Sequence, residues 1–185
     1  GLLYKTLALG SVDVINAFST DGRIRAYDLY NLEDDKNFFP PYYAAVLARN
    51  DTLAKYPQLE ATLNMLAGII DNEKMQDMNY QVDEKGVSAA RVAREFLLEE
   101  GIIKPDDKPL SDPQDTVVIG SKEFTEQEIL GELISIIIEC RTNLGVKRKL
   151  NIGGTIICFN ALKAADLDMY PEYTGTGLVN ILKEG

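Results

Sequence analysis

The fold of this chain is decided by residues 116–142, TVVIGSKEFTEQEILGELISIIIECRT. The run up to Gly120 is apolar and β-branched, which predicts a buried strand that ends at the glycine. Thr125-Glu-Gln-Glu128 has the spacing of a capping box, so we expect a helix that begins there and continues to about Thr142. A strand that turns directly into a long apolar helix is typical of an α/β fold.

The same alternation continues to the carboxyl terminus. Residues 146–152 predict a second strand, residues 155–165 a second helix and residues 167–170 a short third strand. Strands that are joined by helices pair in parallel. Residues 116–185 therefore predict an α/β fold with a mixed, mostly parallel sheet flanked by helices, and ligands of such sheets bind beyond the carboxyl ends of the strands.

A charged, proline-rich stretch precedes this unit. Residues 104–115, KPDDKPLSDPQD, contain three prolines and four aspartates but only one large apolar residue, Leu110. Proline interrupts helices and sheet ladders, and the aspartates resist burial. We therefore expect an exposed, irregular linker that divides the chain into two parts.

Upstream of this linker we predict three helices and two buried strands: helices over 51–68, 72–78 and 88–100, and strands over 12–17 and 43–48. In the first helix, Asp51 is the expected N-cap and Gly68 the expected stop. Pro57 is expected to kink or split this helix. In the third helix, Val92 and Phe96 are expected to lie on the buried face.

The composition excludes the common catalytic and metal-binding arrangements. The chain has 185 residues, a net charge of -10, no histidine and two cysteines. Without histidine there is no Ser-His-Asp or Cys-His catalysis, no histidine-ligated zinc and no histidine pH switch. Cys140 and Cys158 are too few for a four-cysteine metal site, and their apolar neighbours indicate inert core thiols. We predict no catalytic residue, no metal and no cofactor.

The charge and the apolar runs also limit the partners. An acidic chain repels phosphate backbones, so no nucleic-acid partner is expected. The most apolar run, Ile134 to Ile138, is far shorter than the roughly 20 residues that span a bilayer. The first residues lack the charged and apolar regions of a signal peptide. We expect neither a transmembrane nor a signal segment in this chain.

Three predicted strand ends carry motifs that could bind a ligand: Gly120-Ser-Lys-Glu-Phe124, Gly153-Gly-Thr155 and Tyr170-Pro-Glu-Tyr-Thr-Gly-Thr176. Glycine beside a helix start lets backbone N–H groups approach an anionic group, and Lys122 would assist there. Glycines that only permit tight turns also explain these motifs. The glycine patterns of nucleotide-binding loops do not occur.

Tyrosines form a second signal. Tyr170 and Tyr173 flank the last predicted strand, and Tyr42 and Tyr43 lie at the entry to another. Aromatic rings offered from loops hold a quaternary ammonium group by cation–π attraction, worth about 0.5–2 kcal/mol per ring. Half-buried tyrosines with their hydroxyl groups at the surface are the alternative interpretation.

Longer motifs resemble a known family. They are Gly120-Ser-Lys-Glu-Phe-Thr-Glu-Gln127, Asn151-Ile-Gly-Gly-Thr155, Ala161-Leu-Lys to Asp168, Tyr170-Pro-Glu-Tyr-Thr-Gly-Thr-Gly177, Gly10-Ser-Val-Asp-Val-Ile15, Ser19-Thr-Asp-Gly-Arg-Ile24 and Leu32-Glu-Asp-Asp-Lys-Asn-Phe-Phe-Pro-Pro-Tyr42. Together they resemble the substrate-binding proteins of osmoprotectant ABC importers, which take glycine betaine, choline, carnitine or proline betaine. The resemblance implies a lobe like that of type II periplasmic binding proteins and a non-enzymatic, solute-binding function. It also implies an ABC permease as partner and an extracytoplasmic location, tethered to or fused with a membrane transporter.

The order of these segments is permuted relative to that family. There, the segment that matches residues 120–127 begins the mature protein, and those that match residues 19–24 and 38–42 come late. We interpret 1–39 as a remnant of the second lobe, 40–103 as the carboxyl-terminal part of the first lobe, 104–115 as a linker, and 116–185 as the amino-terminal part of the first lobe. An excerpt of a natural tandem array and a deliberate permutant would both have this order.

By resemblance, seven residues would form the ligand site: Lys122, Tyr173, Thr176, Tyr42, Phe18, Gln127 and Thr155. Lys122 would hold the carboxylate or another polar end of the ligand, and Tyr42 and Tyr173 would be walls of an ammonium cage. Phe18 stands where the family usually has tyrosine, so it keeps the cation–π face but loses the hydroxyl group.

The incomplete second lobe has two expected consequences. One wall of the cleft is largely absent, so we expect weak binding of betaine. The open apolar edge of residues 1–39 favours a homodimer or strand exchange. The alternative function is an interaction or linker module that retains the fold without binding a ligand. A small enzyme that uses paired carboxylates is a third hypothesis, which no histidine, metal cluster or nucleotide loop supports.

Overall fold

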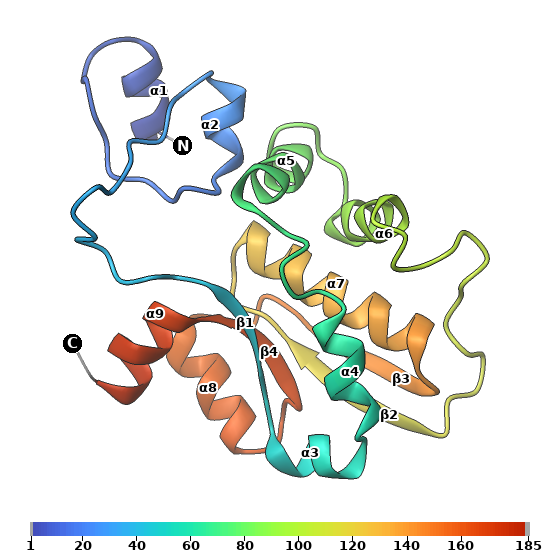
Figure 1. Ribbon diagram of the computed structural model, residues 1–185. Helices are drawn as coiled ribbons and strands as arrows, with labels where there is room; N and C mark the ends of the chain where they lie inside the picture. Colours follow the sequence, from blue (N-terminus) through green and yellow to red (C-terminus); the bar gives the residue numbers. More distant parts are fainter. Residues whose placement is uncertain (1, 184–185) are drawn as a thin grey trace.

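The computed structural model describes residues 2–183 and shows a four-stranded sheet with helices on both faces (Figure 1). The strands are β1 (Ala44–Ala48), β2 (Asp115–Gly120), β3 (Leu144–Lys149) and β4 (Met169–Tyr173). They lie in the order β1-β4-β2-β3, with β2 parallel to β3 and β4, and β1 antiparallel to β4. The predicted α/β class, a mixed and mostly parallel sheet flanked by helices, is confirmed.

The helices account for most of the remaining described residues. They are α1 (Leu2–Ala8), α2 (Gly22–Ala26), α3 (Asn50–Lys55), α4 (Gln58–Asn64), α5 (Asn72–Asp83), α6 (Ala89–Glu99), α7 (Thr125–Arg141), α8 (Thr155–Lys163), α9 (Thr174–Thr176) and the π-helix η1 (Gly177–Leu182). In Figure 1 the amino-terminal helix α2 lies beside α5, on the side away from β3, and α1 lies beyond α2.

Strand alternation divides the core into two faces. In β2, Val117 and Ile119 pack with α7 and α4, whereas Val118 packs with α8 on the opposite face. In β4, Met169 belongs to the first face and Tyr170 to the second. Successive side chains of a strand point to opposite faces, so apolar residues at every position require a sheet that is covered on both sides.

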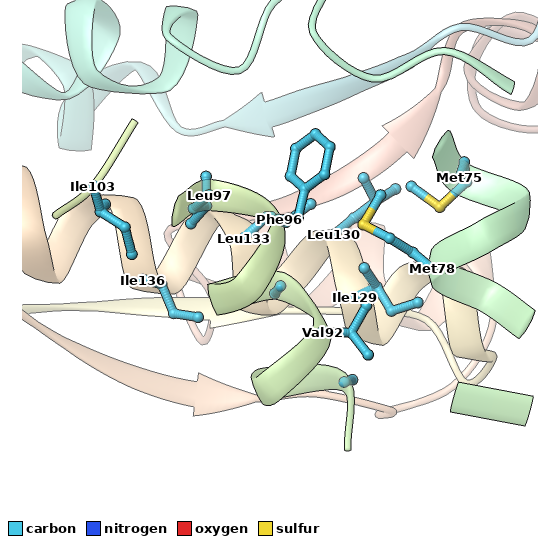
Figure 2. Packing of buried hydrophobic residues seen from close by; sticks show 12 residues of the cluster. Met75, Met78, Val92, Phe96, Leu97, Ile103, Ile129, Leu130, Leu133 and Ile136 are labelled. Atoms are coloured by element: carbon cyan, nitrogen blue, oxygen red, sulfur yellow. The ribbon is translucent and has the colours of Figure 1, made fainter. Parts of the chain in front are cut away.

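Helix α7 is the centre of the molecule because it is buried on two sides. Ile134, Ile137 and Ile138 pack against the sheet. Ile129, Leu130, Leu133 and Ile136 pack instead against α5 and α6, where they meet Met75, Met78, Val92, Phe96 and Leu97 (Figure 2). A helix that is apolar around its whole circumference is stable only when neighbours cover every side. The predicted buried face of residues 88–100 is thereby confirmed.

Several local predictions are confirmed with shifted boundaries. The helix predicted over 51–68 is split at Pro57 into α3 and α4, and the helix predicted over 72–78 extends to Asp83. Asp51 is not the N-cap: Arg49 holds that position, and the Asp51 carboxylate accepts hydrogen bonds from the Arg49 side chain. Asp51 lies inside the first turn, where its carboxylate also accepts from the Thr52 backbone N–H at 2.9 Å.

Three other local predictions are wrong, one of them only in its burial. Thr125 does not cap α7; it is the first helical residue, and its hydroxyl donates to Asp83 Oδ1 at 2.5 Å. Residues 12–17 form no strand, and Val14 is 66% exposed. A strand needs a neighbour for its backbone groups, and no strand among residues 2–183 lies beside this segment. The segment over 43–48 does form a strand, but at the sheet edge and partly exposed rather than buried.

The stretch between the two halves has the predicted character. Residues 104–114 contain no helix or strand and are mostly exposed, and β2 begins at Asp115. The two halves nevertheless build one sheet, because β1 from the first half pairs with β4 from the second. Within residues 2–183 no helix has both the length and the apolar composition needed to cross a membrane.

The amino-terminal segment docks on α5 through α2. A Cβ atom at Gly22 would lie 2.4 Å from the backbone nitrogen of Tyr80, so only glycine allows this approach. Asp21 caps α2 by accepting from the Arg23 backbone N–H at 3.0 Å. Arg25 adds an ion pair with Asp77 of α5. Residues 19–26 are therefore packed on α5.

Candidate ligand-binding site

The carboxyl ends of β2 and β4 bring together a buried ion pair. Lys122 follows β2, Glu172 lies in β4, and each residue is 5% exposed. The Lys122 ammonium donates to Glu172 Oε1. Glu172 also accepts from the Tyr173 backbone N–H at 2.8 Å and from the Tyr170 hydroxyl at 3.2 Å. Parallel neighbours end at the same edge of a sheet, which is why residues 50 positions apart meet here.

Two aromatic rings flank the buried ammonium. The Phe124 and Tyr173 rings stack with their centroids 6.3 Å apart and an interplanar angle of 18°. The Lys122 nitrogen lies 4.7 Å from the Tyr173 centroid and 5.8 Å from the Phe124 centroid. Phe124 is 46% exposed, so it forms the rim of the cluster. The arrangement is one that holds a cation against aromatic faces.

The Tyr173 hydroxyl is held by a carboxylate. It donates to Glu126 Oε1 at 2.6 Å. Burial raises the pKa of Tyr173 far above its usual value, and the negative charge and hydrogen bond of Glu126 raise it further. The phenol therefore remains protonated at all ordinary pH values and acts here as a donor.

Gln127 holds the backbone at Lys122 in place. Its side chain is fully buried, and its Oε1 accepts from the Lys122 backbone N–H at 3.2 Å. Its Nε2 has no hydrogen-bond partner among residues 2–183. Gln127 thus fixes the backbone of the loop and keeps one unused donor.

The other predicted site residues lie at different distances from this cluster. Tyr42 lies at its margin, because its ring packs on Gly175, where a Cβ atom would be 2.8 Å from a ring carbon. Thr176 lies in α9 and Thr155 is the first residue of α8; both are half-buried, and neither side chain has a hydrogen bond within the described chain. Phe18 is 82% exposed in the amino-terminal segment. The structure thus joins Lys122, Tyr173 and Gln127, with Tyr42 beside them.

Three residues of the cluster were missed as site residues by sequence reasoning: Phe124, Glu126 and Glu172. All three lie inside the quoted motifs, so the motifs contained the signal. Glu172 is two positions from Tyr170, which places both side chains on one face of a strand. The pairing with Lys122 requires the strand order, which the motifs do not contain.

Metal ligation and thiol chemistry have no support among the described residues. Between Leu2 and Lys183, no group of three or more histidine, cysteine, aspartate or glutamate side chains could hold a metal ion. Burial raises the pKa of Cys158 to about 11, so its thiol is not an activated nucleophile. A cavity of about 300 Å³ lies elsewhere, between α5 and α6, and none of the predicted site residues lines it.

Comparison with known proteins gives a family match. The family model described as the substrate binding domain of ABC-type glycine betaine transport system matches residues 1–99 and 115–184. The carnitine transport binding protein OpuCC of Listeria monocytogenes is 48% identical over 97 residues, which are 52% of this chain and 32% of that protein. The chain therefore spans about a third of the length of this relative.

Other similar proteins carry related names. The ergothioneine transport permease/ergothioneine binding protein EgtU of Helicobacter pylori is 39% identical over 101 residues, 55% of this chain and 18% of that protein. A glycine-betaine-binding protein of Pseudomonas aeruginosa is 31% identical over 103 residues, 56% of this chain and 33% of that protein. A crystal structure described as a glycine betaine/carnitine/choline ABC transporter matches with a TM-score of 0.53 and 48% identity, covering 55% of this chain and 37% of that chain.

Proposed function

This chain belongs to the family of substrate-binding domains of ABC-type glycine betaine transport systems, and from that membership we propose that it captures a quaternary ammonium solute for an ABC importer. The family comprises binding domains of transporters rather than enzymes. Glycine betaine, choline, carnitine and proline betaine are the proposed ligands.

One observation carries the proposal: an ammonium group already lies against the rings of Tyr173 and Phe124, 4.7 Å and 5.8 Å from their centroids. A quaternary ammonium cannot donate a hydrogen bond, so aromatic faces are the groups that recognise it. We propose Lys122 for the polar end of the ligand and Tyr173, Tyr42 and Phe18 for the ammonium cage, with Gln127, Thr155 and Thr176 as further contacts.

We expect binding to be weak. Phe124 and Phe18 are exposed, so they would leave the quaternary ammonium group of a bound ligand open to water, and water competes with cation–π attraction. Calorimetric titration with glycine betaine, choline and carnitine tests this. We expect the heat of binding to saturate at millimolar solute concentrations. This heat should vanish in Tyr173→Ala and persist in Tyr30→Ala, a control at an exposed side chain. Micromolar binding would refute weak binding, and no saturable heat with any of the three solutes would refute the solute-binding function.

A second candidate function follows from the Lys122–Glu172 pair. Because Glu172 already neutralises the ammonium, a ligand carboxylate would compete with a buried internal partner. This favours the alternative of an interaction or linker module that keeps the fold without a ligand. A folded chain whose melting temperature does not rise with any of the solutes supports this alternative, whereas a rise supports solute binding.

We propose that the first lobe is assembled from segments in permuted order, with 40–103 before 116–185 and with 1–39 as a remnant of the second lobe. The two-part family match, with residues 100–114 between the parts, supports this proposal. The antiparallel pairing of β1 with β4 supports it as well, since it makes one sheet from both segments. The parent gene on either side of codons 1 and 185 tests the proposal. Flanks that carry the remaining segments of two adjacent binding domains would indicate a tandem array, flanks without them would indicate a permutant, and flanks that complete one domain in the family's usual order would refute the proposal.

The proposed partners are a membrane permease and a second copy of the chain. Membership in this family supports an extracytoplasmic location for the domain, and we propose that the chain is tethered to or fused with its transporter. Exposed apolar side chains in residues 2–39, among them Leu9, Phe18 and Tyr30, support a homodimer through the incomplete second lobe. Light scattering tests this, and a monomer at high concentration would refute it.

A further inference from the structure

We propose that Glu126 is a positioning residue that orients the Tyr173 ring and couples it to the Ser19–Thr20 segment. The role of Tyr173 in ligand binding rests on the proposed function. The coupling itself rests on the contacts below, and it can be tested without a ligand.

Glu126 accepts three hydrogen bonds from three different parts of the chain. Its Oε1 accepts from the Tyr173 hydroxyl at 2.6 Å. Its Oε2 accepts from the Thr20 hydroxyl and from Asn79 Nδ2, the latter at 3.0 Å. No lysine or arginine of residues 2–183 forms an ion pair with Glu126. Neutral donors therefore hold this carboxylate, and losing one of them leaves a half-buried charge less well satisfied.

The Ser19–Thr20 segment has a fixed seat on α5. Asn79 Nδ2 donates to the Thr20 carbonyl at 2.8 Å, and Gln76 Nε2 donates to the Ser19 carbonyl at 2.5 Å. Gly22 then lies against the backbone of α5 so closely that no side chain fits there. The main chain of Ser19 and Thr20 is thus held by α5, and this sets the position of the Thr20 hydroxyl relative to Glu126.

The two oxygens of the Glu126 carboxylate therefore bond different parts of the chain. Oε2 bonds Thr20 of the amino-terminal segment, and Oε1 bonds Tyr173 of the candidate site. A displacement of Thr20 removes one of the two donors on Oε2 and leaves Asn79 as the other. The Glu126 carboxylate is then held less firmly, which changes the acceptor that the Tyr173 hydroxyl meets at Oε1. Tyr173 in turn carries the Lys122 ammonium on its ring face. Coupling of this kind is reciprocal, so occupation of the site must also change the stability of the Thr20 contact.

The test uses a matched pair of variants in the full chain. Thr20→Val keeps the shape and removes the hydroxyl, whereas Thr20→Ser keeps the hydroxyl. Thr6→Val is a control, since the Thr6 hydroxyl bonds only within α1. The readout is the ¹³Cζ NMR signal of Tyr173, assigned by its disappearance in Tyr173→Phe. We expect Thr20→Val to shift this signal, and Thr20→Ser and Thr6→Val to leave it in place.

An unchanged Tyr173 signal in Thr20→Val, with the chain folded, overturns the proposal, as does an equal shift in Thr6→Val. A second measurement is hydrogen exchange of residues 19–25, which we expect to quicken in both Glu126→Gln and Tyr173→Phe. Unchanged exchange in both variants also overturns the proposal.

A ligand arm separates this proposal from the proposed function. If glycine betaine binds the unaltered chain, we expect Thr20→Val to weaken its affinity roughly two- to tenfold, the effect of one hydrogen bond, with Thr20→Ser restoring it. If none of glycine betaine, choline and carnitine binds the unaltered chain, the proposed function fails, while the Tyr173 signal still decides the role of Glu126.

Discussion

Replacing Lys122 with methionine is expected to lower the free energy of unfolding by about 3–5 kcal/mol, the usual cost of removing one partner of a buried ion pair. Both side chains are only 6% exposed, so water cannot replace the lost partner. Methionine has a stem of similar length and leaves little cavity. What remains is the Glu172 carboxylate with two neutral donors, the Tyr170 hydroxyl and the Tyr173 backbone N–H.

Urea unfolding followed by far-UV circular dichroism measures this cost, and a double-mutant cycle isolates the pair. Lys122→Met and Glu172→Gln are each expected to be strongly destabilising. The double variant removes both charges together, so its cost should fall short of the sum of the single costs by at least about 2 kcal/mol. If the slope of the unfolding free energy against urea concentration is unchanged, the variants expose the same surface on unfolding, and the native state stays equally compact.

The exposed pair Arg91–Glu95 is the matched control, with side chains that are 71% and 44% exposed. Arg91→Met should cost less than about 0.5 kcal/mol, since exposed ion pairs contribute little. Costs below about 1 kcal/mol for both single variants of the buried pair, adding in the double variant, would refute the reasoning, because the pair would then behave like a surface contact.

Three further predictions concern other parts of the chain. Gly22→Ala should destabilise the chain by about 1–3 kcal/mol in urea unfolding, because its Cβ meets the α5 backbone, whereas a Cβ at Gly177 meets no atom and the backbone there is helical, so Gly177→Ala should not destabilise the chain; equal costs would contradict this. Burial raises the pKa of Cys158 to about 11, so Ellman's reagent should leave this thiol unmodified at pH 8 until urea is added; immediate reaction of both thiols would contradict its burial. Burial also raises the pKa of Asp21, but the hydrogen bonds from Arg23 outweigh it and leave the pKa below its usual 3.8, so the stability from Asp21 is present above pH 3.8 and is lost as the pH falls further. Asp21→Asn should therefore flatten the acid limb of a stability–pH curve, and an unchanged limb would count against this pairing.

The local sequence pattern was sufficient to predict several elements. The apolar run to Gly120 and the helix after it, the split at Pro57 and the linker over 104–115 were all predicted from residues adjacent in sequence. Apart from the N-cap of α3, where the helix begins one residue earlier than expected, the errors lie where a distant partner decides. Thr125 bonds Asp83 instead of capping α7, and residues 12–17 have no neighbouring strand to pair with.

The candidate site divides in the same way. Lys122, Gln127 and Tyr173 were identified from motifs that resemble the family, and the structure brings them together. Glu126 and Glu172 were missed, although both lie within those motifs. A carboxylate in a motif has no visible partner until the strand order is known, so solvated and buried carboxylates look alike in sequence.

The sequence by itself determined the class of the fold, because the alternation of apolar residues depends only on neighbours along the chain. The tertiary structure alone decided that β1 joins β4 in antiparallel orientation, that Lys122 pairs with Glu172 across 50 positions, and that Thr20 reaches Glu126 across 106. The physical reason is that hydrogen bonds and ion pairs form between groups within a few ångströms of each other in space. Those distances are set by how the sheet and helices pack, and no local pattern encodes them.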